Sequence, residues 1–392
     1  MEPSLLDELN AMCEDERCKR AVLAHCPGID PAAAFQPFDA RIHPRDQMLL
    51  HSLHHHRNAS AAFSQYFAIA LQQYASARQI IRLLYGANTV DLDVLDFACG
   101  YGRLLRFLVL AMPPSRIWAS ELQADALAFV QQRFGVQAIA SHVDPGQFEP
   151  RRSFDFIWVA SLFSHLPEAL FHAWLAKLIS LLTPRGILCF SVRDAALLPA
   201  DSVPSAAGIT YLEHSENADL GVDIYGTTYA SEAFVRRAVR MATGDDRIPH
   251  RLPKALAHEQ DLYIVAKDPQ RDLSPLTAFR RGPWGWLDRR HLSRSGELRL
   301  QGWAASLDDG DVEGVEIEVD GRAYRCSTGI ARPDVGAAFA DDRLAHAGWQ
   351  LECNTTAGAS AVQIAVGART ARGETALLHV GTVRCAEEAS AA

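Results

Sequence analysis

The sequence predicts an α/β protein with a doubly wound sheet, preceded by a helical region and followed by an all-β sandwich. Strand-like and helix-like segments alternate between residues 91 and 268, which is typical of a parallel sheet with helices on both faces. Before this stretch the apolar residues recur at helical spacing, and after it they alternate with polar residues. A length of 392 residues agrees with two or three domains.

Four consecutive segments follow from these changes in pattern. We expect a helical region over residues 1–89, an α/β domain over 90–268, a linker over 269–282 and a β-sandwich domain over 283–392. The linker is predicted because Lys267–Pro275 is a polar run that contains prolines.

Within the helical region, a helix is predicted from about Ala59 to Tyr85, because its apolar residues recur every three or four positions. The stripe consists of Phe63, Tyr66, Phe67, Ala70, Leu71 and Tyr74. Such a stripe indicates a buried helix face. The preceding run His51–Arg57 is rich in histidine but has no adjacent carboxylate, and the amino-terminal cysteines lack a C-x-x-C spacing. We therefore expect no metal site.

The strands of the α/β domain are predicted from apolar runs bounded by turn-forming residues. They are Val90–Phe97, Arg116–Glu121, Val136–Ser141, Phe154–Ala160, Ile187–Arg193 and Leu262–Ala266. Ligands of such sheets bind outside the carboxyl ends of the strands, so we expect the functional residues at that edge.

A glycine turn follows the first of these strands. Gly100 and Gly102 let the backbone approach a ligand closely, and the helix that follows directs its first amides toward the same place. A nucleotide-like cofactor fits this arrangement. The dinucleotide pattern G-x-G-x-x-G is incomplete, because Leu105 stands at its third glycine. Pyrophosphate binding, and with it an NAD(P)-dependent oxidoreductase, is therefore the less favoured alternative.

Two acidic residues flank the turn. Asp96 precedes it and suits a cation or hydroxyl groups, such as a sulfonium compound that carries an amino acid. Glu121 ends the second predicted strand, 21 residues after Gly100, which is the right distance to bind a ribose.

These residues resemble the class I S-adenosylmethionine-dependent methyltransferases. Asp96–Gly102 is similar to their D-x-G-x-G-x-G motif, and Glu121 with Leu122 is similar to their ribose-binding acidic position. Phe154–Leu166 resembles their fourth strand and the loop after it, and Leu181–Leu188 resembles the turn and fifth strand that follow. The resemblance covers roughly residues 90 to 268 and implies a Rossmann-like sheet.

The resemblance implies S-adenosylmethionine as cofactor and a set of residues that bind it. These are Asp96, Ala98, Cys99, Gly100, Gly102, Arg103, Glu121, Leu122, Asp144, Ala160 and Ser161. Ala98 replaces the first glycine of the family's motif, and we expect it to crowd the methionine moiety or weaken affinity. Arg103 either reaches the methionine carboxylate or lies in solvent, and Asp144 either accepts from the adenine amine or is a simple loop acid. The helical region before the first strand is also a candidate lid over the cofactor.

His165 is the candidate general base. It follows the fourth strand, where the methyl group should point, and an imidazole can accept a hydroxyl proton near neutral pH. In the alternative it packs on the cofactor or caps a helix. Methyl transfer needs a base only for a poor nucleophile, because much of the rate comes from positioning donor and acceptor.

The segment Ala195–Tyr229 is too long for a plain connection between strands. Long loops in α/β enzymes tend to bind substrates, so we expect acceptor contacts from Tyr211, His214 and Tyr225. The alternative is a surface loop that does not touch the acceptor.

The β-sandwich is predicted from alternation, as in Val315, Ile317 and Val319, and from a hairpin turn at Asp320–Gly321. Its Gly-Trp pairs, together with Arg332–Val335, resemble a small β-domain appended to bacterial glycosyltransferases and methyltransferases of surface-polysaccharide pathways. The tryptophans either stack on sugar rings or belong to the sandwich core.

Composition limits the function. A net charge of −9 argues against a nucleic-acid partner, and the lack of an apolar run of membrane-spanning length favours a cytoplasmic enzyme. We expect an S-adenosylmethionine-dependent methyltransferase of polysaccharide biosynthesis that O-methylates a carbohydrate or small hydroxylated acceptor. The alternative is a cofactor-binding or glycan-binding protein without turnover. The oligomeric state and the acceptor stay open.

Overall fold

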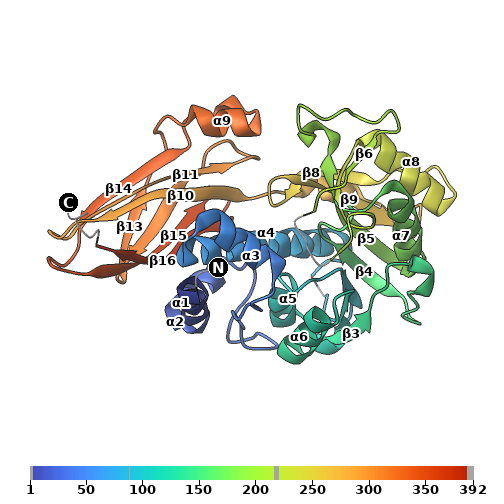
Figure 1. Ribbon diagram of the computed structural model, residues 1–392, viewed down its shortest axis with the longest axis horizontal. Helices are drawn as coiled ribbons and strands as arrows, with labels where there is room; N and C mark the ends of the chain where they lie inside the picture. The colour runs from blue at the N-terminus through green and yellow to red at the C-terminus, as the bar shows by residue number, and fades with distance from the viewer. Residues whose placement is uncertain (1–2, 88, 216–219, 386–392) are drawn as a thin grey trace. The chain divides into compact units, whose positions relative to one another are not determined.

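The computed structural model describes residues 3–87, 89–215 and 220–385, which form two compact units (Figure 1). The sandwich unit comprises Met1–Gly28, Ala40–Gln72 and Arg281–Ala392. The α/β unit comprises Ile29–Asp39 and Gln73–Arg280. Each unit therefore combines segments that are far apart in the sequence. The predicted division into four consecutive segments differs from this grouping by contacts and stays a prediction.

The α/β unit is built on a sheet of nine strands in which five parallel strands have the order β3-β2-β1-β4-β5. Their bounds are β1 (Val94–Phe97), β2 (Ile117–Glu121), β3 (Gln137–Ala140), β4 (Phe154–Val159) and β5 (Leu182–Asp194). The side chains of β1 and β4 are buried along their whole length, as expected for strands that are covered on both faces. The predicted Rossmann-like core is confirmed.

The last part of this sheet is antiparallel, so the expectation that the predicted strand Leu262–Ala266 joins a parallel sheet was wrong. β9 (Gln260–Ala266) runs antiparallel to β5 and pairs with β8 (His250–Leu256). Only three residues separate β8 from β9, and so short a turn can join antiparallel neighbours but cannot make a crossover. A hairpin of β6 (Ile209–Leu212) and β7 (Thr227–Ala230) pairs with the last residues of β5.

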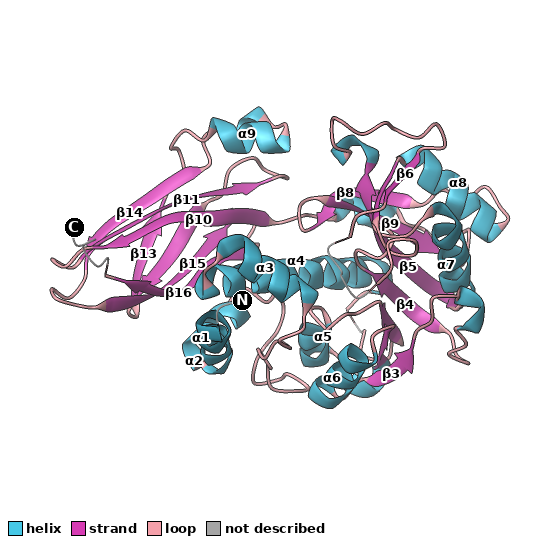
Figure 2. Cartoon of the chain, in the orientation of Figure 1, coloured by secondary structure: helices cyan, strands magenta, loops and turns pink. Residues whose placement is uncertain are grey.

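Helices cover both faces of this sheet (Figure 2). The second part of α4 (Ala59–Tyr85), α5 (Leu105–Ala111) and α6 (Ala124–Phe134) lie on one side, and α7 (Glu168–Ser180) and α8 (Glu232–Thr243) lie on the other. Local sequence sets their ends: the Ser231 side chain caps α8, and Gly135 and Gly244 close α6 and α8 in the left-handed conformation.

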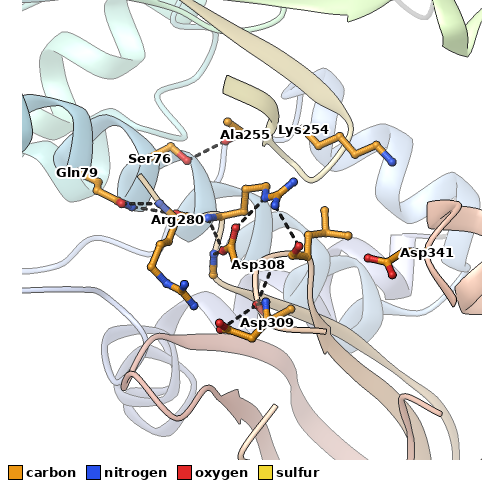
Figure 3. Close-up of polar contacts among 12 residues, drawn as sticks. Ser76, Gln79, Lys254, Ala255, Arg280, Asp308, Asp309 and Asp341 are labelled. Carbon is orange, nitrogen blue, oxygen red and sulfur yellow. Dashed lines mark hydrogen bonds and ion pairs between the residues drawn. The ribbon is translucent and has the colours of Figure 1, made fainter. Parts of the chain in front are cut away.

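The carboxyl-terminal part of α4 is held to its own unit by side-chain hydrogen bonds (Figure 3). The Ser76 hydroxyl donates to the Ala255 carbonyl at 2.8 Å. The Gln79 amide donates to the Arg280 carbonyl at 2.9 Å and accepts from the Arg280 amide at 2.7 Å. These bonds fix α4 against β8 and against the chain that leaves the unit.

The sandwich unit contains two antiparallel sheets, as predicted. One has the order β10-β11-β14, and the other has the order β13-β12-β15-β16. The bounds are β10 (Pro283–Leu292), β11 (Glu297–Ser306), β12 (Gly314–Val319), β13 (Arg322–Cys326), β14 (Gly348–Asn354), β15 (Ala361–Arg369) and β16 (Thr375–Arg384). Asp320 and Gly321 both have positive φ between β12 and β13, which is the signature of a tight hairpin turn.

Four amino-terminal helices belong to the sandwich unit, and they contact strands of both of its sheets. They are α1 (Pro3–Glu14), α2 (Glu16–Leu23), α3 (Gln47–His56) and the first part of α4. The Ser64 hydroxyl accepts from the Val380 amide at 2.9 Å, and the absent side chains of Gly367 and Gly381 leave room for His25 and Ser60. The aromatic stripe of α4 is buried and belongs to a core.

Candidate active site

The glycine turn Ala98–Gly102 lies between β1 and α5, at the carboxyl ends of the parallel strands. Gly100 and Gly102 both have positive φ, but their surroundings and structural roles differ. A Cβ at Gly100 would meet no atom within 4 Å, so this position opens onto space that a ligand can enter. A Cβ at Gly102 would lie 2.6 Å from the Phe134 ring, so this glycine serves the packing of α6.

Ala98 also lies in the left-handed region, with φ of 56°. This conformation suits glycine and costs roughly 1–2 kcal/mol for a residue with a Cβ. The family's pattern has glycine at this position, and the structure gives the conformational reason. Ala98 is therefore a point of backbone strain within the turn.

Glu121, at the end of β2, ties the turn to the neighbouring strand. One carboxylate oxygen, Oε2, accepts from the Gly100 amide at 2.9 Å, and the other, Oε1, accepts from the amides of Leu122 at 2.7 Å and Gln123 at 3.1 Å. Burial raises the pKa of Glu121, and these three amide donors oppose that rise. A carboxylate has about four lone-pair positions, so Oε2 can accept one further hydrogen bond.

Asp96, on β1, is buried directly beneath the turn. Its Oδ2 atom has no hydrogen-bond partner among the described residues. Burial raises the pKa of this carboxyl group to about 8, the charge of Glu121 adds to the rise, and Arg103 opposes it. Asp96 is therefore held neutral near pH 7. Burial also raises the pKa of the Cys99 thiol, which excludes this residue as a thiolate nucleophile.

The residues after β4 form a second part of the site. Ser161 has φ of 60°, and its amide donates to the Ser191 hydroxyl at 2.7 Å. That hydroxyl donates to Gln260 at 2.7 Å, and the Gln260 amide in turn donates to the Ser161 hydroxyl at 3.1 Å. The network fixes the chain that directly follows Ala160. Sequence reasoning missed Ser191 and Gln260; Ser191 is a polar residue within the apolar run Ile187–Val192, whereas Gln260 lies before the predicted strand Leu262–Ala266 and gave no such signal.

His165 is buried in the same loop, where two contacts fix its imidazole ring. Its Nδ1 atom is 2.7 Å from the Gly226 carbonyl oxygen, and its ring stacks on the Tyr225 ring with centroids 4.4 Å apart and an interplanar angle of 8°. A carbonyl oxygen can only accept, so Nδ1 carries the proton. In the neutral ring the lone pair is then on Nε2, which is the atom that can act as a base.

The three residues predicted to contact the acceptor lie in the hairpin β6–β7 or next to it. Tyr225 stacks on His165, whereas the Tyr211 hydroxyl donates to the Val222 carbonyl. The His214 side chain is exposed. The structure thus brings Tyr225 to the candidate base and leaves the acceptor contacts of all three residues as predictions.

Apolar side chains are exposed just after two neighbouring strands. Leu122 follows β2 and is 36% exposed, and Val143 follows β3 and is 41% exposed. Val143 was missed by sequence reasoning, although its place after a predicted strand was a usable signal. Asp144 is exposed, and its carboxylate accepts from the Gly146 amide at 2.8 Å, whereas a contact with the adenine amine stays a prediction.

Histidine and cysteine residues near the amino terminus lie in the sandwich unit. His51 stacks on His55, and His56 stacks on Trp286. Across the described ranges, no group of three or more His, Cys, Asp or Glu side chains is arranged to hold a metal ion. None of the helices in the described part of the chain has the length and apolar character needed to cross a membrane.

Comparisons with known proteins place this site in a recognised kind of domain. Residues 94–186 match a family model described as a methyltransferase domain, and the glycine turn lies within the matched residues. No curated protein matches the sequence.

Several solved structures are similar to about half of the chain. They include the glycopeptide N-methyltransferase MtfA with S-adenosyl-L-homocysteine (18% identity, 50% of this chain and 87% of that one, TM-score 0.36). Magnesium protoporphyrin IX methyltransferase from Synechocystis PCC 6803 has 15% identity over 53% and 87% of the two chains, with a TM-score of 0.36. The 1,6-didemethyltoxoflavin-N1-methyltransferase of Burkholderia thailandensis has 19% identity over 50% and 79%, with a TM-score of 0.35.

Proposed function

We propose that the protein is an S-adenosylmethionine-dependent methyltransferase that methylates a hydroxyl group of a carbohydrate or another small hydroxylated acceptor. The observation that carries this proposal is the Glu121 carboxylate, which is bound to the Gly100 amide at the mouth of the glycine turn. The match of residues 94–186 to a methyltransferase domain supports the same activity.

The residues present fit this cofactor. Glu121 Oε2 can accept one more hydrogen bond, which a ribose hydroxyl would donate. The open space at Gly100 admits a ligand close to the backbone, and the exposed side chains of Leu122 and Val143 offer apolar contacts to a flat base. Asp96 has a buried oxygen without a partner, and a nearby positive charge would stabilise its ionised form.

When bound, S-adenosylmethionine supplies a methyl group that is activated by a positively charged sulfur. The chain's own residues then have two tasks. The glycine turn, Glu121 and the Ser161–Ser191–Gln260 network hold donor and acceptor in place, and positioning is a large part of the rate. His165 Nε2 takes the proton of the acceptor hydroxyl, because a neutral hydroxyl is a poor nucleophile.

The acceptor class rests on the candidate base and on the hairpin beside it. A base is of use for a hydroxyl, which must lose its proton as the new bond forms, and polar and aromatic residues of the hairpin suit a hydroxyl-rich molecule. The sandwich domain would aid acceptor recognition or assembly, in agreement with its resemblance to domains of surface-polysaccharide pathways. Its Trp349 is core, with 1% of its surface exposed.

The experiment is calorimetric titration of the full-length protein with S-adenosylmethionine and S-adenosylhomocysteine, with NAD and NADP as control ligands. We expect micromolar affinity for the sulfur compounds and about a 100-fold loss in the Glu121→Ala variant, because the hydrogen bond from the ribose to a charged group is removed and the Gly100 amide loses its anchor. Asp246→Ala removes an exposed carboxylate of the same unit and should bind as the wild type does.

Turnover is then measured with the methyl-labelled donor and a panel of free and linked sugars. His165→Gln should lower the rate about 100-fold or more while S-adenosylhomocysteine binding stays unchanged. Binding without turnover on any hydroxylated acceptor would favour the non-catalytic alternative. Binding of a nicotinamide cofactor alone would overturn the proposal.

A further inference from the structure

We propose that Tyr225 and Tyr211 are positioning residues for His165, and that the β6–β7 hairpin holds this imidazole with its lone pair on Nε2. The proposal rests on the proposed function, because it concerns the same base. It assigns these tyrosines a different role from the acceptor contacts that the sequence suggested.

The first step is the orientation of the ring. The Gly226 carbonyl, 2.7 Å from Nδ1, holds the proton on that nitrogen. The Tyr225 ring lies nearly parallel to the imidazole at a centroid distance of 4.4 Å. Tilting the imidazole about its Cβ–Cγ bond would break this stacking contact. The two contacts together select one tautomer and one orientation.

The second step is the support of Gly226. A Cβ at this residue would lie 2.4 Å from the Leu212 carbonyl oxygen and 2.6 Å from the Tyr211 ring. The Tyr211 ring therefore covers Gly226 directly, and its hydroxyl is held by the Val222 carbonyl. Tyr211 thus fixes the peptide whose carbonyl accepts from His165.

The third step is the attachment of the hairpin to the loop after β4. The Gly226 amide donates to the His165 carbonyl at 2.9 Å, and the Thr228 amide donates to the Ser164 carbonyl at 2.8 Å. The Thr228 hydroxyl donates to the Leu166 carbonyl at 2.6 Å. Further along, Tyr229 and Ala230 of β7 pair with Arg193 and Asp194 of β5. The hairpin is therefore hydrogen-bonded to His165 and to the residues directly before and after it. This contact is a structural reason for the long insertion between β5 and α8.

The consequence for the reaction is that the hairpin acts through the base. When orientation and tautomer are fixed, nearly all molecules hold the base in its reactive form. Small misplacements of a catalytic group lower the rate strongly. We expect loss of the stack to reduce kcat and to leave the KM for the acceptor unchanged. A tyrosine that bound the acceptor would mainly raise KM.

The test that needs no acceptor is nuclear magnetic resonance of the full-length protein with 15N-labelled histidine. The His165 signals are assigned by their loss in His165→Gln. We expect the wild-type ring to show a protonated Nδ1 and an unprotonated Nε2, whereas free histidine prefers the opposite tautomer. Tyr225→Phe keeps the stacked ring and should keep this pattern, but Tyr225→Leu should show both tautomers in exchange.

The kinetic arm uses the acceptor found in the screen of sugars. We expect Tyr225→Leu to lower kcat about tenfold and Tyr225→Phe to restore it. Two results would overturn the proposal: a wild-type ring protonated on Nε2, or a Tyr225→Phe variant as impaired as Tyr225→Leu. Since the ring signals do not depend on cofactor binding, failure here is separable from failure of the titration with S-adenosylhomocysteine.

Discussion

In both units a titratable group is buried in its neutral form, but the ionised form is a cation for the histidines of the sandwich unit and an anion for Asp96 of the α/β unit. In the sandwich unit, His379 is completely buried and His25 is partly buried over Gly367, and desolvation lowers the pKa of His25 to about 4 and that of His379 to about 3. In the α/β unit, burial raises the pKa of Asp96 to about 8. Burial thus keeps all three groups neutral at pH 7, and what differs is the direction in which acid acts on each unit.

The surroundings of these groups also differ. His379 is completely buried, with the Ser64 hydroxyl 3.4 Å from Nδ1. Its imidazole is kept neutral because the packed protein interior excludes the water that would stabilise a charge. Asp96 lies beneath a turn that opens at Gly100, where a ligand can come close. A neutral carboxyl group in such a place is a feature of binding sites, because a positive ligand can restore its charge.

The largest effect that this comparison predicts is acid destabilisation of the sandwich unit. Each histidine has a lowered pKa in the folded state, so its stabilising contribution is complete above the unfolded pKa of about 6.5 and is lost as pH falls toward the folded value. Between about pH 7.5 and pH 5 the two residues together should remove about 4 kcal/mol from the free energy of unfolding.

Hydrogen exchange followed by mass spectrometry in increasing denaturant measures this loss unit by unit. His379→Leu should halve the loss between the two pH values, since only one of the two buried imidazoles then titrates. His54→Leu changes an exposed histidine of α3 and should leave the loss intact. An equal loss in His379→Leu and the wild type would show that this histidine is not the cause.

The α/β unit should respond to the same acidification with the opposite sign. Asp96 has a raised pKa in the folded state, so its contribution is complete below the unfolded value of about 4 and is lost as pH rises through about 8. Lowering the pH from about 7.5 to 5 should therefore add about 3 kcal/mol to the stability of this unit. Asp96→Asn should abolish the gain.

The measurement is the same exchange experiment, read on peptides from β1 and β4. Asp91→Asn changes an exposed acid shortly before β1 and should preserve the gain, which makes it the matched control. If Asp96→Asn still gained stability on acidification, the neutral state of Asp96 would be contradicted.

The comparison also shows what the sequence could reveal. The α/β sheet and the sandwich were predictable because each depends on local patterns, such as the buried run of β1 or the alternation Val315, Ile317 and Val319. The grouping of the amino-terminal helices with the sandwich was not predictable. It depends on fits between distant residues, such as His25 over Gly367, that no local pattern encodes.

The same distinction holds for the site. Asp96, Gly100 and Glu121 were found because a motif places them at fixed separations along the chain. Ser191 and Gln260 belong to different strands that meet only because β9 runs antiparallel to β5. Partners of this kind follow from sheet topology, and the antiparallel strand was the part of the topology that the sequence did not predict.

The smallest expected effect concerns backbone strain, which occurs in both units. Ala98 in the α/β unit and Ala340 in the sandwich unit have φ of 56° and 52°, so each is an alanine in a conformation that favours glycine. Replacing either by glycine should stabilise its own unit by about 1 kcal/mol, because the strain of the Cβ is removed. Exchange measurements on each unit separate the two gains.

Only Ala98 lies in the glycine turn, so the pair of variants also tests what the strained alanine does to the cofactor. Ala98→Gly should tighten S-adenosylhomocysteine binding severalfold in calorimetry, since it removes the Cβ from the side of the turn where the methionine moiety is expected. Ala340→Gly should leave that affinity unchanged. A gain in stability with no gain in affinity would mean that Ala98 strains the backbone but does not crowd the ligand. The reverse would mean that the side chain contacts the cofactor, and that the left-handed conformation is tolerated at little cost.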